Sequence, residues 1–291
     1  TTDQVPTGDD APVYNASHFL GFFSVFNNDV VKDATLYKGD IPASYDSRLS
    51  SVLDVKTLDE IPDKLTMTGG VGILTSRLMI NMPFNKQRTA VMLAGRVTYG
   101  GLITPYIINR LKDTKLYFYD FNGKITHVVN KNNRLYLSFY NGYDKIGVMR
   151  LMNIGYGNTN TVFRWNHIFS DRLTSNLSFF YTRYRYDIDV IMKPFDFSLM
   201  AGISDCTGKY DFTFLMNDKI TAKFGISTTY HKYNQGELDD RTGVVGQYLS
   251  LDTKAKIYRK AIESAVYYGH EHNITPLFSV RYGLRLSLYQ N

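Results

Sequence analysis

The sequence predicts an all-β membrane protein built around an antiparallel transmembrane β-barrel. Three observations predict this fold. Apolar and polar residues alternate strictly over runs of 9 to 15 residues, which suits a tilted strand that crosses a membrane and exceeds the usual soluble strand. Five short polar turns separate these runs, at 85–88, 130–133, 170–172, 217–219 and 272–273. Aromatic residues make up 14% of the 291 residues, and barrels collect such side chains at the two membrane interfaces.

The run from 115 to 129 has two clearly different faces. Tyr117 and Ile125 fall on one face, and Asp120 and Lys124 fall on the other, because successive side chains of a strand point to opposite sides. An apolar face suits lipid, and a face that repeats Arg, Lys and Asp suits a wet interior. A soluble β-sandwich or propeller is the alternative, and the length of the runs favours the barrel.

Counting the runs predicts about eleven strands. They span 64–73, 76–84, 89–99, 115–129, 134–143, 158–169, 175–188, 198–216, 220–234, 257–271 and 276–289. Long connections are expected opposite the short turns, at 100–114, 144–157, 189–197 and 235–256. In outer-membrane barrels the short turns face the periplasm and the long loops face outward.

The strand count and one run raise two further expectations. Bacterial single-chain barrels have even strand numbers, and an unpaired sheet edge in lipid is costly. We therefore expect the eleven strands to be part of a larger barrel. Between 175 and 190 the alternation changes phase, which either a β-bulge or a strand rising above the bilayer would explain.

Residues 1–60 lack the long alternation and predict a small α/β segment. Residues 30–38 and 50–56 are expected to form two strands, with a turn at 39–42. A folded element just before the first barrel strand suggests a plug. The expected division is therefore a plug element at 1–60 and barrel strands at 61–291.

Composition argues against several other classes of function. The single cysteine, Cys206, excludes an internal disulfide and a cysteine-based metal site. The net charge of +6 is spread without a Lys/Arg run, so nucleic-acid binding has little support. No apolar run approaches 18 residues, so no transmembrane helix is expected.

Enzymatic and metal sites have weak support. In His270-Glu271-His272 adjacent residues would point to opposite faces of a strand, which argues against a shared metal. The acidic stretches at 187–189 and 237–240 could hold Ca²⁺ in outer loops, although solvated loops explain them as well. We expect no enzyme, no catalytic residue, no metal site and no cofactor.

Several segments resemble TonB-dependent outer-membrane receptors, in the variant common in Bacteroidetes. Residues 31–39 (VKDATLYKG), 41–45 (IPASY) and 48–55 (RLSSVLDV) are similar to the end of that family's plug domain. The barrel start at 69–78 and the strands at 115–120 and 281–287 are similar too. Asp46-Ser47 stands where the family usually has two small glycines. The resemblance implies that residues 1–60 are the C-terminal part of the plug and that residues 61–291 are the N-terminal half of the barrel, with about 11 strands of 22. It also implies that the coupling box, the first half of the plug and the second half of the barrel lie outside this sequence.

The resemblance implies a multi-pass protein of the cell outer membrane that actively imports a nutrient. Its implied partners are outer-membrane lipid, the remainder of the barrel, a surface lipoprotein, and the energy-coupling protein TonB, which would act through the missing N-terminal region. A passive porin-like channel and a structural barrel subunit of a cell-surface complex remain alternatives. No set of residues in the sequence specifies the substrate.

Two groups of residues are candidates for contact with a substrate. They are the plug residues Tyr14, Asn15, His18 and Phe19, and loop aromatics that include Tyr99, Tyr106, Tyr143 and Tyr156. Aromatic side chains with hydroxyl groups suit glycans, peptides and chelates. The simpler interpretation of each residue is an interface girdle or plug packing.

Overall fold

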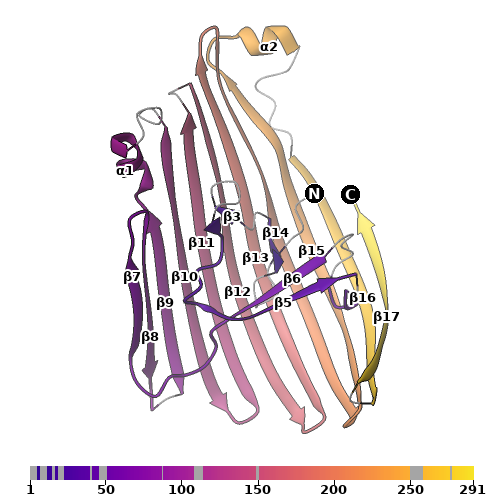
Figure 1. Cartoon of the computed structure of the whole chain (residues 1–291). Coiled ribbons are helices and arrows are strands. Elements are labelled where there is room, and N and C mark those ends of the chain that lie inside the picture. The colour runs from indigo at the N-terminus through magenta and orange to yellow at the C-terminus, as the bar shows by residue number, and fades with distance from the viewer. Residues whose placement is uncertain are drawn as a thin grey trace.

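The computed structural model describes residues 5–6, 12–14, 17–18, 23–39, 41–45, 51–86, 88–107, 114–148, 151–249, 258–275 and 277–291. Within these residues the chain forms one 11-stranded sheet, here called the wall, and three two-stranded sheets. Each wall strand pairs antiparallel with its neighbour in sequence. Figure 1 shows the wall as one tall surface of strands standing side by side.

All eleven expected wall strands are present, which confirms the predicted fold class. They run from 6 to 23 residues. In order they are β7 (Thr66–Val71), β8 (Thr75–Phe84), β9 (Thr89–Thr98), β10 (Lys115–Asn130), β11 (Asn133–Val148), β12 (Met152–Ser170), β13 (Leu173–Met192), β14 (Phe195–Asn217), β15 (Ile220–Asp240), β16 (Tyr258–Thr275) and β17 (Phe278–Gln290).

Six short strands before the wall form what we call the inner segment, which crosses in front of the wall in Figure 1. They are β1 (Val5–Pro6), β2 (Pro12–Val13), β3 (Ser17–His18), β4 (Phe23–Ser24), β5 (Val31–Lys38) and β6 (Ser51–Thr57). The two strands expected at 30–38 and 50–56 are therefore β5 and β6, which pair antiparallel. The described part of residues 1–60 contains strands and turns but no helix.

Strand β10 shows how the wall separates its two faces. Phe121 and Ile125 are each 41% exposed, whereas Phe118, Asp120 and Lys124 on the opposite side are at most 4% exposed. The inner segment covers that second side, so we call it the inward face and the other the outward face. The outward face carries the apolar band expected of a surface in lipid.

The apolar outward face gives a testable prediction. We expect Ile125→Arg, in the middle of the outward band, to lower the free energy of unfolding in a bilayer by about 2–4 kcal/mol, because a cation at the bilayer midplane is poorly solvated. Tyr117→Arg, on the same strand and face and similarly exposed, should cost at most about 1 kcal/mol because it lies near the interface. Denaturant titration in lipid vesicles would measure both, and equal costs would contradict a membrane-spanning wall.

Two of the four expected long connections are wrong. Strand β11 continues to Val148 and β12 begins at Met152, so 144–157 is mostly strand. Likewise β13 ends at Met192 and β14 begins at Phe195. The alternation fades there because a strand that extends beyond a membrane has water on both faces, although its backbone ladder continues. The fifth short turn is also misplaced, since residues 272–273 lie within β16, which runs to Thr275, and β17 begins at Phe278.

The other two connections contain the only helices in the described part of the chain, α1 (Gly100–Ile107) and α2 (Val244–Leu249). Both lie at the upper end of the wall in Figure 1. Neither of these two helices is long and apolar enough to cross a membrane.

The change of phase in β13 does not come from a bulge. Its register with β12 is continuous from Met152 opposite Val190 to Ile168 opposite Thr174, and its register with β14 shows no shift. The composition of the two faces changes instead. Beyond Tyr181 the outward face of β13 becomes charged, as expected of a strand that leaves the bilayer.

Strands β7 and β17 are the two edges of the wall. On β17 the outward side chains Leu284, Leu286 and Leu288 are 70–75% exposed. One side of each edge strand has no ladder partner among the described residues. Unpaired backbone groups cost several kcal/mol each in a bilayer, so both edges require further strands in a membrane.

Candidate functional site

The inner segment is fixed to the inward face by polar contacts spread across the wall. Arg77 on β8, Lys124 on β10 and Arg285 on β17 each reach it. The pairs are Arg77 with Asp29 at 2.9 Å, Lys124 with Thr57 at 2.8 Å, and Arg285 with the Ala43 carbonyl at 3.3 Å. Two small apolar clusters add to these polar anchors, because Val30 packs against Met79, Met92 and Ala94, and Val13 and Val25 pack against Tyr140.

The most buried anchor is a charged cluster around His18. Its Nδ1 lies 2.6 Å from an oxygen of Asp144, its Nε2 lies 3.7 Å from Asp120, and its ring stacks on Phe118 at 4.5 Å. Arg96 Nε donates to Asp120 at 2.6 Å and Arg96 Nη2 donates to the Ser24 carbonyl at 2.7 Å. The side chains of His18, Asp120 and Asp144 are at most 3% exposed. One arginine therefore neutralises a buried wall carboxylate and holds the inner segment.

A second anchor lies at Tyr14. Its hydroxyl donates to Asp205 on β14, and its ring lies 6.2 Å from that of Tyr184. Asp205 also contacts His231 Nδ1 at 2.8 Å, and His231 Nε2 lies 3.8 Å from Glu263. This chain of polar groups runs across the inward faces of β14, β15 and β16.

The connector between the inner segment and the wall is held by an ion pair at Lys32. Its Nζ lies 2.9 Å from Asp59 and 3.0 Å from Glu60. Burial alone would raise the pKa of Asp59, but the hydrogen bond and charge of Lys32 outweigh it and hold that pKa below its usual range. The hydrogen bonds that Lys32 donates to the two carboxylates raise the pKa of Lys32.

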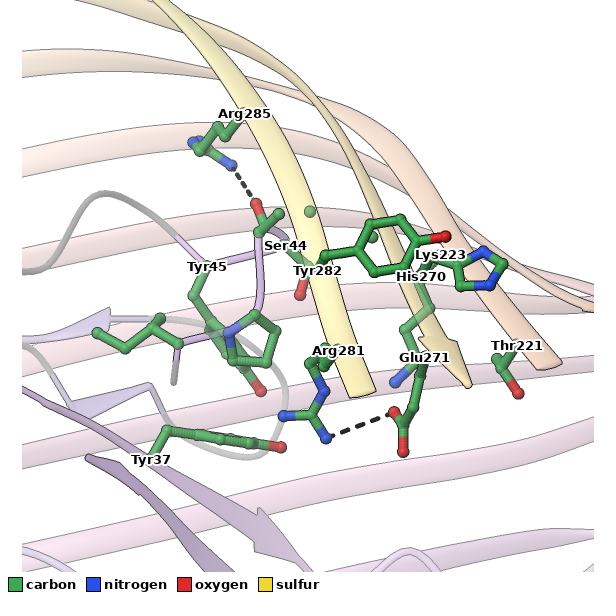
Figure 2. Close-up of a pocket in the computed structure, with 15 residues that line it drawn as sticks. Tyr37, Ser44, Tyr45, Thr221, Lys223, His270, Glu271, Arg281, Tyr282 and Arg285 are labelled. Atoms are coloured by element: carbon green, nitrogen blue, oxygen red, sulfur yellow. Dashed lines mark hydrogen bonds and ion pairs between the residues drawn. The ribbon is translucent and has the colours of Figure 1, made fainter. Parts of the chain in front are cut away.

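A cavity of about 340 Å³ lies between the loop at 41–45 and the inward faces of β15, β16 and β17 (Figure 2). Arg281 Nη2 lies 3.4 Å from Glu271, and Tyr45 donates to Asp54 at 3.1 Å. The polar side chains that line the cavity include Tyr37, Tyr45, Lys223, Glu271, Arg281 and Arg285. Three cations and one carboxylate, with two tyrosines, suit a polar or anionic guest.

The structure places the sequence-predicted substrate residues in different environments. Tyr14 and His18 are docked on the inward face, whereas Asn15 and Phe19 lie outside the described residues. Tyr99 contacts the Gly72 carbonyl, and its hydroxyl lies 3.2 Å from Ser76 Oγ. Tyr106 on α1 is 90% exposed at the upper end.

The other two loop aromatics, Tyr143 and Tyr156, lie on opposite faces of the wall. None of the described residues that were predicted to contact substrate lines the cavity. Tyr156 is 5% exposed, and Tyr143 lies on the outward face beside Asp187. The cavity residues Tyr37, Arg281 and Arg285 were missed because residues 37–45 on one side of the cavity are far in sequence from residues 221–285 on the other. No local pattern in the sequence joins them.

The acidic and histidine patterns hold no grouped metal ligands in the part of the chain that the structure describes. Figure 2 shows His270 and Glu271 pointing to different sides of β16. In the upper loop, Asp240 accepts backbone hydrogen bonds from Gly243 at 2.9 Å and Gly246 at 2.7 Å. Its carboxylate therefore stabilises the turn into α2.

Several solved structures share this architecture. A copper transporter, OprC, is 10% identical with a TM-score of 0.68 over 98% of this chain and 46% of its own. The FrpB iron transporter from Neisseria meningitidis is 12% identical with a TM-score of 0.68 over 99% and 50% of the two chains. The ferric enterobactin receptor PfeA from Pseudomonas aeruginosa is 12% identical with a TM-score of 0.65 over 98% and 49%.

These matches confirm the expected fold, that of part of a TonB-dependent receptor barrel. The chain spans about half the length of the structures it matches. No protein-family model matches it, and no curated protein sequence does.

Proposed function

We propose that this chain is part of an active importer of the outer membrane, in which residues 61–291 form the N-terminal half of a barrel and residues 1–60 the C-terminal part of its plug. The observation that carries the proposal is the inner segment, which is fixed to the inward face by polar contacts from β8 to β17. A passive channel needs no such element. Further strands would close the edges at β7 and β17.

In this mechanism substrate enters from the end that carries α1 and α2. It would first meet exposed aromatics such as Tyr106. We propose that Tyr14, His18 and their neighbours Asn15 and Phe19 then become accessible when the inner segment shifts. The cavity beside Arg281 and Arg285 would be the start of a polar path toward the short turns. The wall would supply inward polar side chains along that path. The shift of the inner segment would need an external source of energy.

The proposed partners follow from the same arrangement. TonB would pull on the plug from the periplasmic end, where the short turns lie. Outer-membrane lipid would cover the outward face. A surface lipoprotein would have room at the upper end, where β13, β14 and β15 extend to Met192, Phe195 and Asp240.

The experiment uses the full protein in planar lipid bilayers and in cells. We expect little ion conductance when the inner segment is docked and an open pore when residues 1–57 are deleted. In cells, uptake of ferric enterobactin or copper, which are named for two of the matched structures, should require TonB. Uptake that persists without TonB would favour a passive channel, and a closed, tightly assembled barrel without uptake would favour a structural subunit.

A further inference from the structure

A groove of about 400 Å³ lies on the outward face of the wall, over β13 to β16. Its floor is formed by the small residues Gly202, Ser204 and Cys206 of β14. Longer side chains line both sides of the groove. On β13 they are Tyr181, Arg183 and Arg185, on β15 Tyr230, Lys232 and Asn234, and on β16 Tyr258. A strand with small side chains between strands with long ones makes a channel on an otherwise even sheet.

Cations cross this groove at one height. Arg183 is opposite Ser204, Ser204 is opposite Lys232, and Lys232 is opposite Lys260. Since residues directly opposite share a face of the sheet, these three cations form a row, and Arg185 lies one step above it. All four side chains are exposed.

These four cations have no carboxylate partner within the described chain. Lys232 Nζ lies 4.8 Å above the ring of Tyr258. The nearest acidic residues on the outward face of β13 have other partners, because Asp187 is hydrogen-bonded to Tyr143 and Asp189 lies 3.1 Å from Arg241. The row is therefore a concentration of positive charge that the protein itself does not neutralise.

The row lies at the upper edge of the apolar band. On β13 the outward residues Phe179 and Tyr181 are 53% and 40% exposed directly below Arg183, and on β15 Ile226 and Tyr230 are 56% and 38% exposed below Lys232. Tyrosine followed by cations marks a membrane interface, where a ring lies in the headgroup region and Lys or Arg reaches the phosphates. The end of the wall with α1 and α2 is the outer end.

We propose that the groove binds the phosphorylated headgroup of a lipid in the outer leaflet, an inference that rests on the proposed membrane-spanning role. Arg183 and Arg185 can bind phosphate oxygens with two parallel hydrogen bonds each, and Lys232 and Lys260 add charge. The acyl chains then lie along the apolar band below. A free phosphate ion would gain nothing from that band, whereas a lipid satisfies both parts of the surface.

Native mass spectrometry on the full protein in detergent tests this proposal. The probes are dimyristoylphosphatidic acid and dimyristoylphosphatidylcholine, which share acyl chains and differ in headgroup charge. We expect preferential retention of the phosphatidic acid. The triple variant Arg183→Gln, Lys232→Gln, Lys260→Gln should bind it about 100-fold more weakly, since each cation near an anionic surface contributes a factor of about five. The matched control is Arg172→Gln, Lys131→Gln, Lys219→Gln, which removes the same charges from the short turns and should change little.

The possible outcomes distinguish a failure of the lipid-headgroup site from a failure of the proposed membrane-spanning role. Equal losses in both triple variants, or no preference for phosphatidic acid, would overturn the headgroup site while leaving a lipid-covered wall intact. Displacement of the lipid by inorganic phosphate at the same concentration would mean that the site takes phosphate alone and would also overturn it. Failure to retain either lipid would contradict the membrane-spanning wall itself. Unchanged circular dichroism and melting temperature would show that both variants are folded.

Discussion

A disulfide that joins the inner segment to the wall is expected to stop transport without unfolding the protein. A Cβ atom added at Gly283 on β17 would lie 3.0 Å from the Cβ of Ala43, slightly closer than the roughly 3.5–4.5 Å of a disulfide, and 2.9 Å from the Tyr268 carbonyl oxygen on β16. Ala43→Cys with Gly283→Cys, in a Cys206→Ser background, should therefore close after small shifts of the loop at 41–45 and of β17 relative to β16. We expect uptake to fall at least about tenfold under oxidising conditions and to recover on reduction, because a gate that cannot move blocks each turnover.

A second disulfide provides the control. Leu36 and Leu53 are directly opposite each other on β5 and β6, so Leu36→Cys with Leu53→Cys links two strands within the inner segment. This link leaves the segment free to leave the wall, and uptake should stay near its original level. Normal uptake by the oxidised Ala43→Cys, Gly283→Cys protein would contradict a mechanism in which this part of the plug moves.

Arg96→Met is expected to release the part of the inner segment around β3 and β4. The substitution keeps much of the side chain but removes the cation beside Asp120, whose side chain is fully buried, and the donor to the Ser24 carbonyl. Breaking a buried ion pair by removing one partner costs about 3–5 kcal/mol. Hydrogen exchange of the amides in β3 and β4 should accelerate at least about 100-fold, as a local opening of that energy requires.

Arg77→Met is the matched comparison. Arg77 also joins the wall to the inner segment, through Asp29 at 2.9 Å, but its side chain is 47% exposed. Water can replace part of that interaction, so the cost should be about 1 kcal/mol or less. If the two arginine variants accelerate exchange in β3 and β4 equally, the buried cluster is not the main anchor.

The wall could be predicted from sequence because one physical cause sets both its pattern and its structure. Lipid on one face and a polar interior on the other impose strict alternation, as Asp120 and Phe121 show on β10. Where water reaches both faces of a strand, its two faces no longer differ, and the alternation in the sequence is lost. This explains why 144–157 and 189–197 read as loops although the ladder of β11 to β14 continues through them.

The candidate site was much less predictable. Tyr14 and His18 stood out in a segment without alternation, yet their partners Asp205 and Asp144 are 191 and 126 positions away. Arg285 looks like any inward residue of a barrel strand until the turn at 41–45 is placed against it. Such pairings depend on how the inner segment crosses the wall, and a single sequence contains no local record of that path.

The spread of anchors along the wall also constrains the order of folding. Arg285 binds the Ala43 carbonyl across a sequence separation of 242 residues. Contacts so distant in sequence form late, because very long loops must close first. The amino-terminal residues leave the ribosome before the wall strands, but we expect them to reach their native positions last.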